Sequence, residues 1–208
     1  MQDRTCLNLF LAFLFLISGC SSKPGVTIKR FDFNESPTST SWKKIAVLPF
    51  SGDKKFRRTS AEWFSFHLQR QQHYSIVTPT FAEIEIKNQG IDAPENKFSI
   101  EQVQRAGRIL AVDAIFTADI ETQKRSKSPV KISIQLIDVK TGEMIATHTI
   151  GYPSWVLLWD NFQEYVKLAT DAAGRDFLKV LKHLAEEKQD EAFPDNTPSS
   201  DNKDSNET

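Results

Sequence analysis

The sequence predicts an α+β domain built on a single mixed β-sheet with packed helices. Short apolar runs alternate with amphipathic helical segments in its first half, which is typical of crossover connections. A strand meander with a tight turn follows in its second half. The expected order over residues 43–186 is β-α-β-α-α-β-β-β-α. Because few helices are available to cover a second face, a three-layer arrangement is disfavoured.

The first half of the domain alternates strands and helices. Apolar runs bounded by Pro or Gly predict strands, and an apolar face recurring every three to four residues predicts helices. The expected elements are a strand at 45–50, a helix at 56–71, a strand at 74–77 and a short helix opening at residue 80. Thr80 and Glu83 have the spacing of a capping box, and Gly90 suits the end of this short helix.

The second half begins with another capping-box pattern, formed by Ser99 and Gln102. The helix that it opens is expected to bury Ile100, Val103, Ala106 and Leu110. Strands at 114–120, 130–139 and 144–150 follow, and a turn at 140–143 joins the last pair. Asp160 and Gln163 are expected to cap a final helix whose apolar stripe is Phe162, Val166, Ala169, Ala173, Phe177, Val180 and Leu184.

The amino-terminal segment resembles a bacterial lipoprotein signal. An apolar run from Leu7 to Leu16, broken by Asn8, is too short to span a bilayer and suits a cleaved signal. Ile17-Ser18-Gly19-Cys20 follows, and the resemblance implies cleavage between Gly19 and Cys20, with lipid on Cys20. Two or three acyl chains would anchor the protein stably, whereas one holds only marginally.

Composition divides the rest of the chain. Residues 1–19 are the expected signal, 20–42 a flexible lipidated tether and 43–186 the globular domain. Residues 187–208 are expected to be an acidic disordered tail, since residues 186–208 hold eight acidic residues and two lysines. Cys6 leaves with the signal and Cys20 carries lipid, so neither a disulfide nor a cysteine zinc site is expected.

Three local phrases are similar to the curli-assembly lipoprotein family (CsgG) and its relatives, which include the penicillin-binding-protein activator LpoB and the amino-terminal domain of TolB. The phrases are Lys44–Phe50, Ala106–Ala118 and Ile134–Glu143. The resemblance covers roughly residues 43–185 and implies a role in envelope assembly rather than an enzyme. Curli-type members are pores with long hairpin insertions. The connection 122–129 is short and basic, which disfavours a pore.

The sequence therefore predicts a non-enzymatic adaptor at the outer membrane, facing the periplasm of a Gram-negative bacterium. Ser21 after Cys20 favours the outer membrane by resemblance to family sorting signals. Activation of a cell-wall synthase is one specific version, a subunit of a CsgG-like secretion complex is an alternative, and an envelope enzyme is the least supported class. The expected partners are the membrane and an envelope protein, without nucleic acid; self-association stays open.

No cofactor beyond the covalent lipid and no metal site are expected. The four histidines are interpreted as surface or core-edge residues, and Asp119 with Glu121 as a solvated strand face rather than an acid–base pair. An unusually apolar connection precedes the last helix, where either a lid on the core or a partner contact is possible. The candidate contact residues are Trp155, Val156, Leu157 and Trp159, with Phe66 as a further candidate off its helix stripe.

Overall fold

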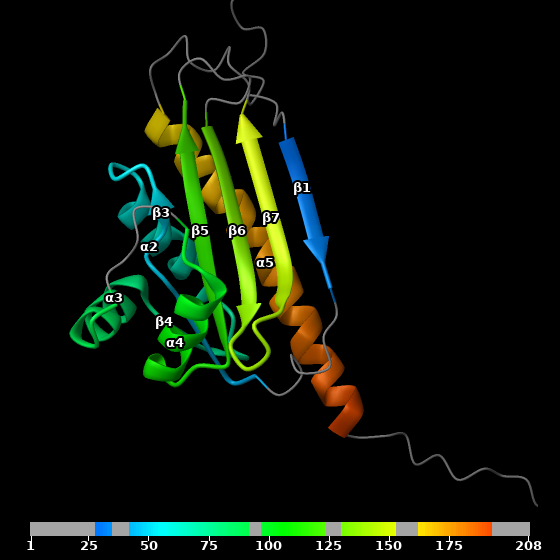
Figure 1. Cartoon of the computed structure of the whole chain (residues 1–208). Helices are drawn as coiled ribbons and strands as arrows, with labels where there is room; N and C mark the ends of the chain where they lie inside the picture. Colours follow the sequence, from blue (N-terminus) through cyan, green and yellow to red (C-terminus); the bar gives the residue numbers. More distant parts are fainter. Residues whose placement is uncertain (1–27, 35–41, 92–96, 124–129, 153–161, 193–208) are drawn as a thin grey trace, which may run out of the picture.

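The structure, a computed structural model, describes residues 28–34, 42–91, 97–123, 130–152 and 162–192, with side chains of the last segment described as far as residue 186. Figure 1 labels its helices and strands. In chain order they are β1 (Ile28–Phe33), β2 (Lys44–Val47), β3 (Ser51–Gly52), α2 (Arg57–Leu68), β4 (Ser75–Val77), α3 (Pro79–Asn88), α4 (Ile100–Leu110), β5 (Ala114–Thr122), β6 (Val130–Asp138), β7 (Met144–Tyr152) and α5 (Phe162–Ala192).

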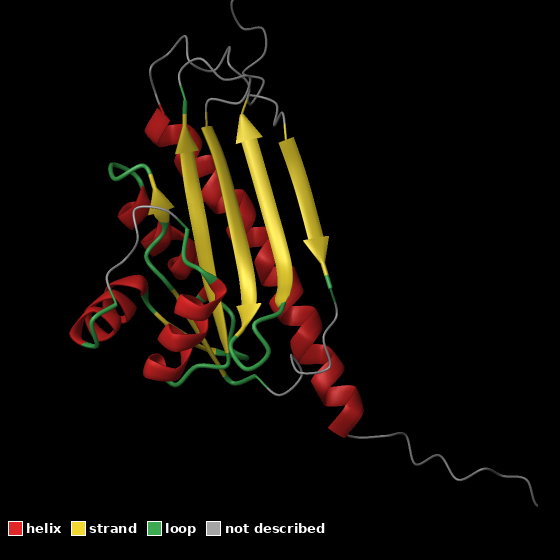
Figure 2. Ribbon diagram, viewed as in Figure 1, coloured by secondary structure: helices red, strands yellow, loops and turns green. Residues whose placement is uncertain are grey.

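The strands form one seven-stranded mixed sheet in the order β1-β7-β6-β5-β2-β4, with β3 paired to β5 off this path (Figure 2). β5, β6 and β7 are the predicted antiparallel meander. β2 lies parallel to both β4 and β5, as the crossover segments predict. The predicted α+β class with a single mixed sheet is therefore confirmed.

Helices cover both faces of part of the sheet, which corrects the expectation of one covered face. Ile45 and Val47 of β2 pack with α2 and α5, whereas Ala46 and Leu48 pack with α3 and α4. Successive side chains of a strand point to opposite faces, so a strand apolar on both sides requires two covers. The short α3 and α4 suffice because this second cluster reaches only β2, β4 and one end of β5 and β6.

Of the two predicted capping boxes, one forms in the structure and the other does not. Ser99 and Gln102 form the predicted reciprocal capping box at the start of α4. α3 instead begins after Thr78 with Pro79 in its first turn, because proline is pre-organised for the first helical position. The Thr80 hydroxyl donates to Glu62 of α2, so the predicted Thr80–Glu83 capping box is wrong.

Two boundaries of the predicted domain also change. Residues 28–33, expected to lie in the flexible tether, form edge strand β1 antiparallel to β7. Trp42, also assigned to the tether, is buried at 2% exposure in the core. α5 continues to Ala192, beyond the predicted start of the acidic tail at residue 187. The extension at residues 28–33 is explained by the pairing of β1 with β7, far away in sequence.

The long helix α5 presents the predicted stripe to the sheet. Its residues Val166, Ala169, Ala173, Phe177, Val180 and Leu184 are buried, and Phe162 is partly buried. Ile100, by contrast, was expected on the core face of α4 but is 53% exposed. As the first residue of α4, it lies at the end of the stripe, near the turn glycine Gly142. Within the described residues, no helix is both long and apolar enough to cross a membrane.

Candidate functional site

One face of β1, β7, β6 and β5 carries polar side chains and points away from α5. Figure 2 shows α5 behind these strands and no described helix in front of their upper halves. The strand register places directly opposed side chains together on this surface, which we call the open face. Its residues are Arg30, Asp32, Asp119, Glu121, Lys131, Ser133, Gln135, Thr147 and Thr149.

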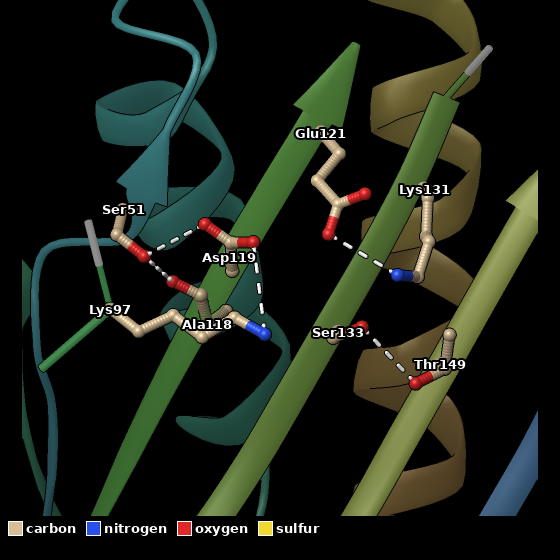
Figure 3. Close-up of polar contacts among 8 residues, drawn as sticks. All are labelled: Ser51, Lys97, Ala118, Asp119, Glu121, Lys131, Ser133 and Thr149. Carbon is tan, nitrogen blue, oxygen red and sulfur yellow. Dashed lines mark hydrogen bonds and ion pairs between the residues drawn. The ribbon is translucent and has the colours of Figure 1, made fainter. Parts of the chain in front are cut away.

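The charged groups of the open face contact one another in separate pairs, as Figure 3 shows. Asp119 accepts a hydrogen bond of 3.1 Å from the Ser51 hydroxyl and lies 3.9 Å from the Lys97 ammonium. The Lys131 ammonium donates to Glu121 at 3.2 Å. Asp119 and Glu121 share a strand face as predicted, but each has its own cation, and they do not converge on one point. This arrangement fits a solvated face better than an acid–base pair.

Hydroxyl and amide groups continue the open face toward β1. The hydroxyls of Ser133 and Thr149 lie 3.1 Å apart across β6 and β7 (Figure 3). On β1 the Arg30 guanidinium donates to the Asp32 carboxylate at 2.7 Å, and both side chains are exposed. The surface therefore offers hydrogen-bonding groups and weak ion pairs that a partner protein could exchange for its own.

A second candidate is a cleft of about 440 Å³ where β5 begins and β6 ends. Its two carboxylates are engaged by the fold. Asp113 accepts hydrogen bonds from the backbone amides of Lys43 and Lys44, at 2.7 and 2.9 Å. Asp138 accepts one from the Trp42 indole at 2.9 Å. These bonds tie the start of β2 to the β5–β6 end, so the acidic groups of the cleft have a structural role.

Sequence reasoning missed this network because Trp42 was placed in the tether. A signal for Asp138 was present in the sequence, since it lies two residues before the predicted turn. Its Oδ1 accepts from the Thr141 amide at 2.7 Å, and Gly142 follows with a φ of 76°. The predicted hairpin turn at 140–143 is thus confirmed, with Asp138 as the residue that closes it.

The histidines occupy different environments. His67 of α2 is partly buried and lies 2.9 Å from Asp171 of α5. His148 of β7 is fully buried, which corrects its interpretation as a surface or core-edge residue. Among the described residues, neither ring nitrogen of His148 has a hydrogen-bond partner, and its Nε2 lies 3.7 Å from Asp176. The described residues contain no cluster of His, Cys, Asp and Glu able to hold a metal ion.

Burial lowers the pKa of His148 below its usual value of 6.5, because desolvation disfavours the imidazolium. Asp176 partly offsets this effect and Lys29 of β1 adds to it. The pKa of Asp176 is lowered: burial acts to raise it, but the hydrogen bond and charge of Lys29, with Lys179 and His148, outweigh burial. β1 and α5 are therefore connected through Lys29 and Asp176, whose charged atoms lie 3.0 Å apart.

Of the predicted contact residues, Phe66 lies within the described part of the chain. It is 57% exposed on α2, with the Arg70 guanidinium 5.1 Å from its ring centroid. Trp155, Val156, Leu157 and Trp159 lie outside the described residues, as do Gly19 and Cys20. The role of each stays a prediction.

No protein-family model and no curated protein sequence matches the chain. Among solved structures it is similar to the PelC dodecamer from Paraburkholderia phytofirmans (14% identity, TM-score 0.42, 76% of this chain and 98% of that one). It is also similar to lipoprotein GNA1162 from Neisseria meningitidis (16%, 0.41, 51% and 79%) and to the LpoB C-terminal domain from Escherichia coli (13%, 0.41, 54% and 83%). The resemblance to CsgG and TolB stays a prediction.

Proposed function

We propose that this protein is a non-enzymatic binding module of the bacterial cell envelope, anchored in the outer membrane by lipid on Cys20 and facing the periplasm. The open face is the observation that carries the proposal. Its carboxylates, ammonium groups and hydroxyls are distributed over neighbouring strands and paired locally, and they can form the hydrogen bonds that a polar protein interface uses. A reaction centre would need such groups to converge on one substrate position.

The anchor and the fold fit the same role. Lipid on Cys20 would fix one end of the chain at the membrane, and the first described element after it is β1, at the edge of the open face. The domain would then present this face to a protein within reach of the membrane. Activation of a cell-wall synthase is the specific version that we favour, because the sequence phrases resemble a family that contains such activators.

Site-specific photo-crosslinking in living cells tests this function. A photoreactive phenylalanine analogue at Gln135 reports on the open face, and one at Phe66 reports on α2. The same analogue at Lys87, on the exposed surface of α3, is the matched control. We expect a defined envelope protein to be captured from Gln135 and not from Lys87.

The crosslink should disappear in the Cys20→Ala variant, because the unanchored domain no longer reaches its partner. Equal labelling from Gln135 and Lys87, or a crosslink from Gln135 that is indifferent to Cys20→Ala, would contradict the proposal. Capture from Phe66 alone would move the binding surface from the sheet to α2.

A further inference from the structure

Among the described residues, the outer edge of β1 is a row of backbone hydrogen-bonding groups without a strand partner. β1 ends the sheet, and within the described residues no strand lies on its other side (Figure 1). The backbone amide of Asn34 donates to the carbonyl oxygen of Ile145 in β7, so Asn34 continues the β1–β7 register. Antiparallel pairing uses alternate residues, so the even-numbered residues face β7. Lys29, Phe31 and Phe33 therefore direct their N–H and C=O groups outward.

The side chains of β1 leave its outward-facing backbone groups accessible to another strand. Sheet edges are commonly protected by a lysine that points across them. Here the Lys29 ammonium is drawn to Asp176 of α5, 3.0 Å away. Phe31 packs edge-on against His148 and Phe177 with its ring partly buried. Arg30 and Asp32 stand on the open face, with side chains 77% and 57% exposed.

The charge pattern of β1 is complementary to itself. When two copies of the strand run antiparallel with Phe31 opposite Phe31, each Arg30 lies directly opposite Asp32 of the other copy. Lys29, Phe31 and Phe33 then form the hydrogen-bonded pairs, and about six backbone bonds join the two edges. Arg30 and Asp32 fall in the non-hydrogen-bonded pairs, where opposed side chains are closest.

The neighbouring registers are disfavoured by the same two charges. Sliding one copy by two residues in one direction places Arg30 opposite Arg30, and sliding it the other way places Asp32 opposite Asp32. Like charges directly opposed destabilise a strand pair. A slip of one residue would place each outward-facing residue of one copy opposite a residue of the other copy whose backbone groups are already bonded to β7. The hydrogen bonds between the two edges would then be lost.

We infer that β1 is a self-association edge, at which a second copy of this chain adds its own β1 antiparallel to give a two-fold dimer with one continuous sheet. The inference goes beyond the proposed function, since a binding module could act as a monomer. In this arrangement the open faces of both copies lie on the same side of the joined sheet, which doubles the surface offered to a partner.

Charge reversal tests the pairing on the full lipidated protein purified in detergent. The mass of the protein component is measured by sedimentation over a range of concentrations. We expect a dimer whose dissociation constant rises tenfold or more in Arg30→Asp and in Asp32→Arg, because each creates two like-charge pairs. The double variant Arg30→Asp/Asp32→Arg should recover the dimer, since it exchanges the two charges. Lys87→Asp on α3 makes the same change of charge away from the edge and should dimerise like the wild type.

Disulfide crosslinking tests the register independently of affinity. In cells that express both variants, Arg30→Cys and Asp32→Cys should crosslink to each other, because opposed residues of a non-hydrogen-bonded pair lie within disulfide reach. Neither variant alone should crosslink. In this register the two copies of residue 30, like those of residue 32, are diagonal neighbours, about 7–8 Å apart, which is too far for a disulfide. Thermal unfolding of each variant establishes that it folds.

A wild type that stays monomeric at every concentration would overturn the inference. So would a dimer that is indifferent to both single reversals, because its contact would lie elsewhere. A folded double variant that remains monomeric would overturn the proposed register. None of these results bears on the capture of a partner protein from Gln135, so the dimer and the proposed function can fail separately.

Discussion

His148 should make this domain less stable as the pH falls below about 6.5, the usual pKa of histidine. In the folded protein the imidazole is fully buried beside the rings of Phe31 and Phe177, without a hydrogen bond to any described residue. Around it lie the charges of Asp176, Lys29 and Lys179. Burial lowers the pKa of His148, so the unfolded chain takes up a proton at a higher pH than the folded protein does.

The sign of the effect follows from this difference. Well above pH 6.5 the imidazole is neutral in both states, and His148 does not change the stability with pH. As the pH falls below 6.5, the imidazole of His148 becomes protonated in the unfolded state but stays neutral in the folded state. The free energy of unfolding then falls by up to about 1.4 kcal/mol per pH unit. The loss ends once the pH passes below the lowered pKa of the folded protein. Asp176, whose pKa is also lowered, destabilises the fold only at more acidic pH, below its usual value of 3.8.

The perturbation that isolates this effect is His148→Phe. Phenylalanine retains an aromatic ring against Phe31 and Phe177 and removes two buried nitrogens that lack hydrogen bonds, each of which costs about 1–3 kcal/mol when unsatisfied. At neutral pH the variant should be at least as stable as the wild type. Between pH 6.5 and pH 5 its stability should change less than that of the wild type.

Urea denaturation from pH 5 to pH 8, followed by tryptophan fluorescence, measures this difference; Trp42 is buried and reports on the core. His73→Ala is the control, because it removes an exposed histidine instead of the buried one. If His148→Phe retains the full wild-type slope below pH 6.5, the reasoning about this buried imidazole is refuted.

Three further variants test the packing by the same urea denaturation. Phe177→Ala should cost about 3–5 kcal/mol, because the buried ring contacts Phe64 and Phe116 as well as Phe31; a loss below 1 kcal/mol would contradict this. Gly107→Ala should destabilise by about 1–3 kcal/mol, because its Cβ would lie 2.3 Å from a Val139 methyl, and adding Val139→Ala should restore much of the loss. Ser99→Ala should cost about 1 kcal/mol through the lost capping box, and Ser99→Thr should cost less.

Features determined by neighbouring residues were predictable from the sequence. The Ser99–Gln102 capping box, the turn before Met144 and the strand alternation of β6 involve residues a few positions apart. The Thr80 cap was not predictable in this way. Glu62 lies 18 positions earlier, and its carboxylate becomes available to the Thr80 hydroxyl only after α2 and α3 pack together.

β1 and His148 show how tertiary contacts decide the remaining cases. Residues 28–33 contain three apolar and three charged side chains without strict alternation. They lie in a polar stretch and pair with β7, more than 100 positions away. His148 shares the buried side of β7 with Ala146 and Ile150, and this two-residue period was a usable signal for its burial. The paired charges of the open face could not be foreseen, because strand register determines which of them meet.

Lipid on Cys20 is the anchor of the proposed binding module, and mass spectrometry of the protein isolated from membranes tests for it directly. We predict an amino-terminal peptide that begins at Cys20 and carries a diacylglyceryl group on sulfur and an acyl chain on the new amino terminus. A peptide that extends upstream of Cys20, or an unmodified cysteine in protein recovered from the cytosol, would contradict the anchored binding module proposed for this chain.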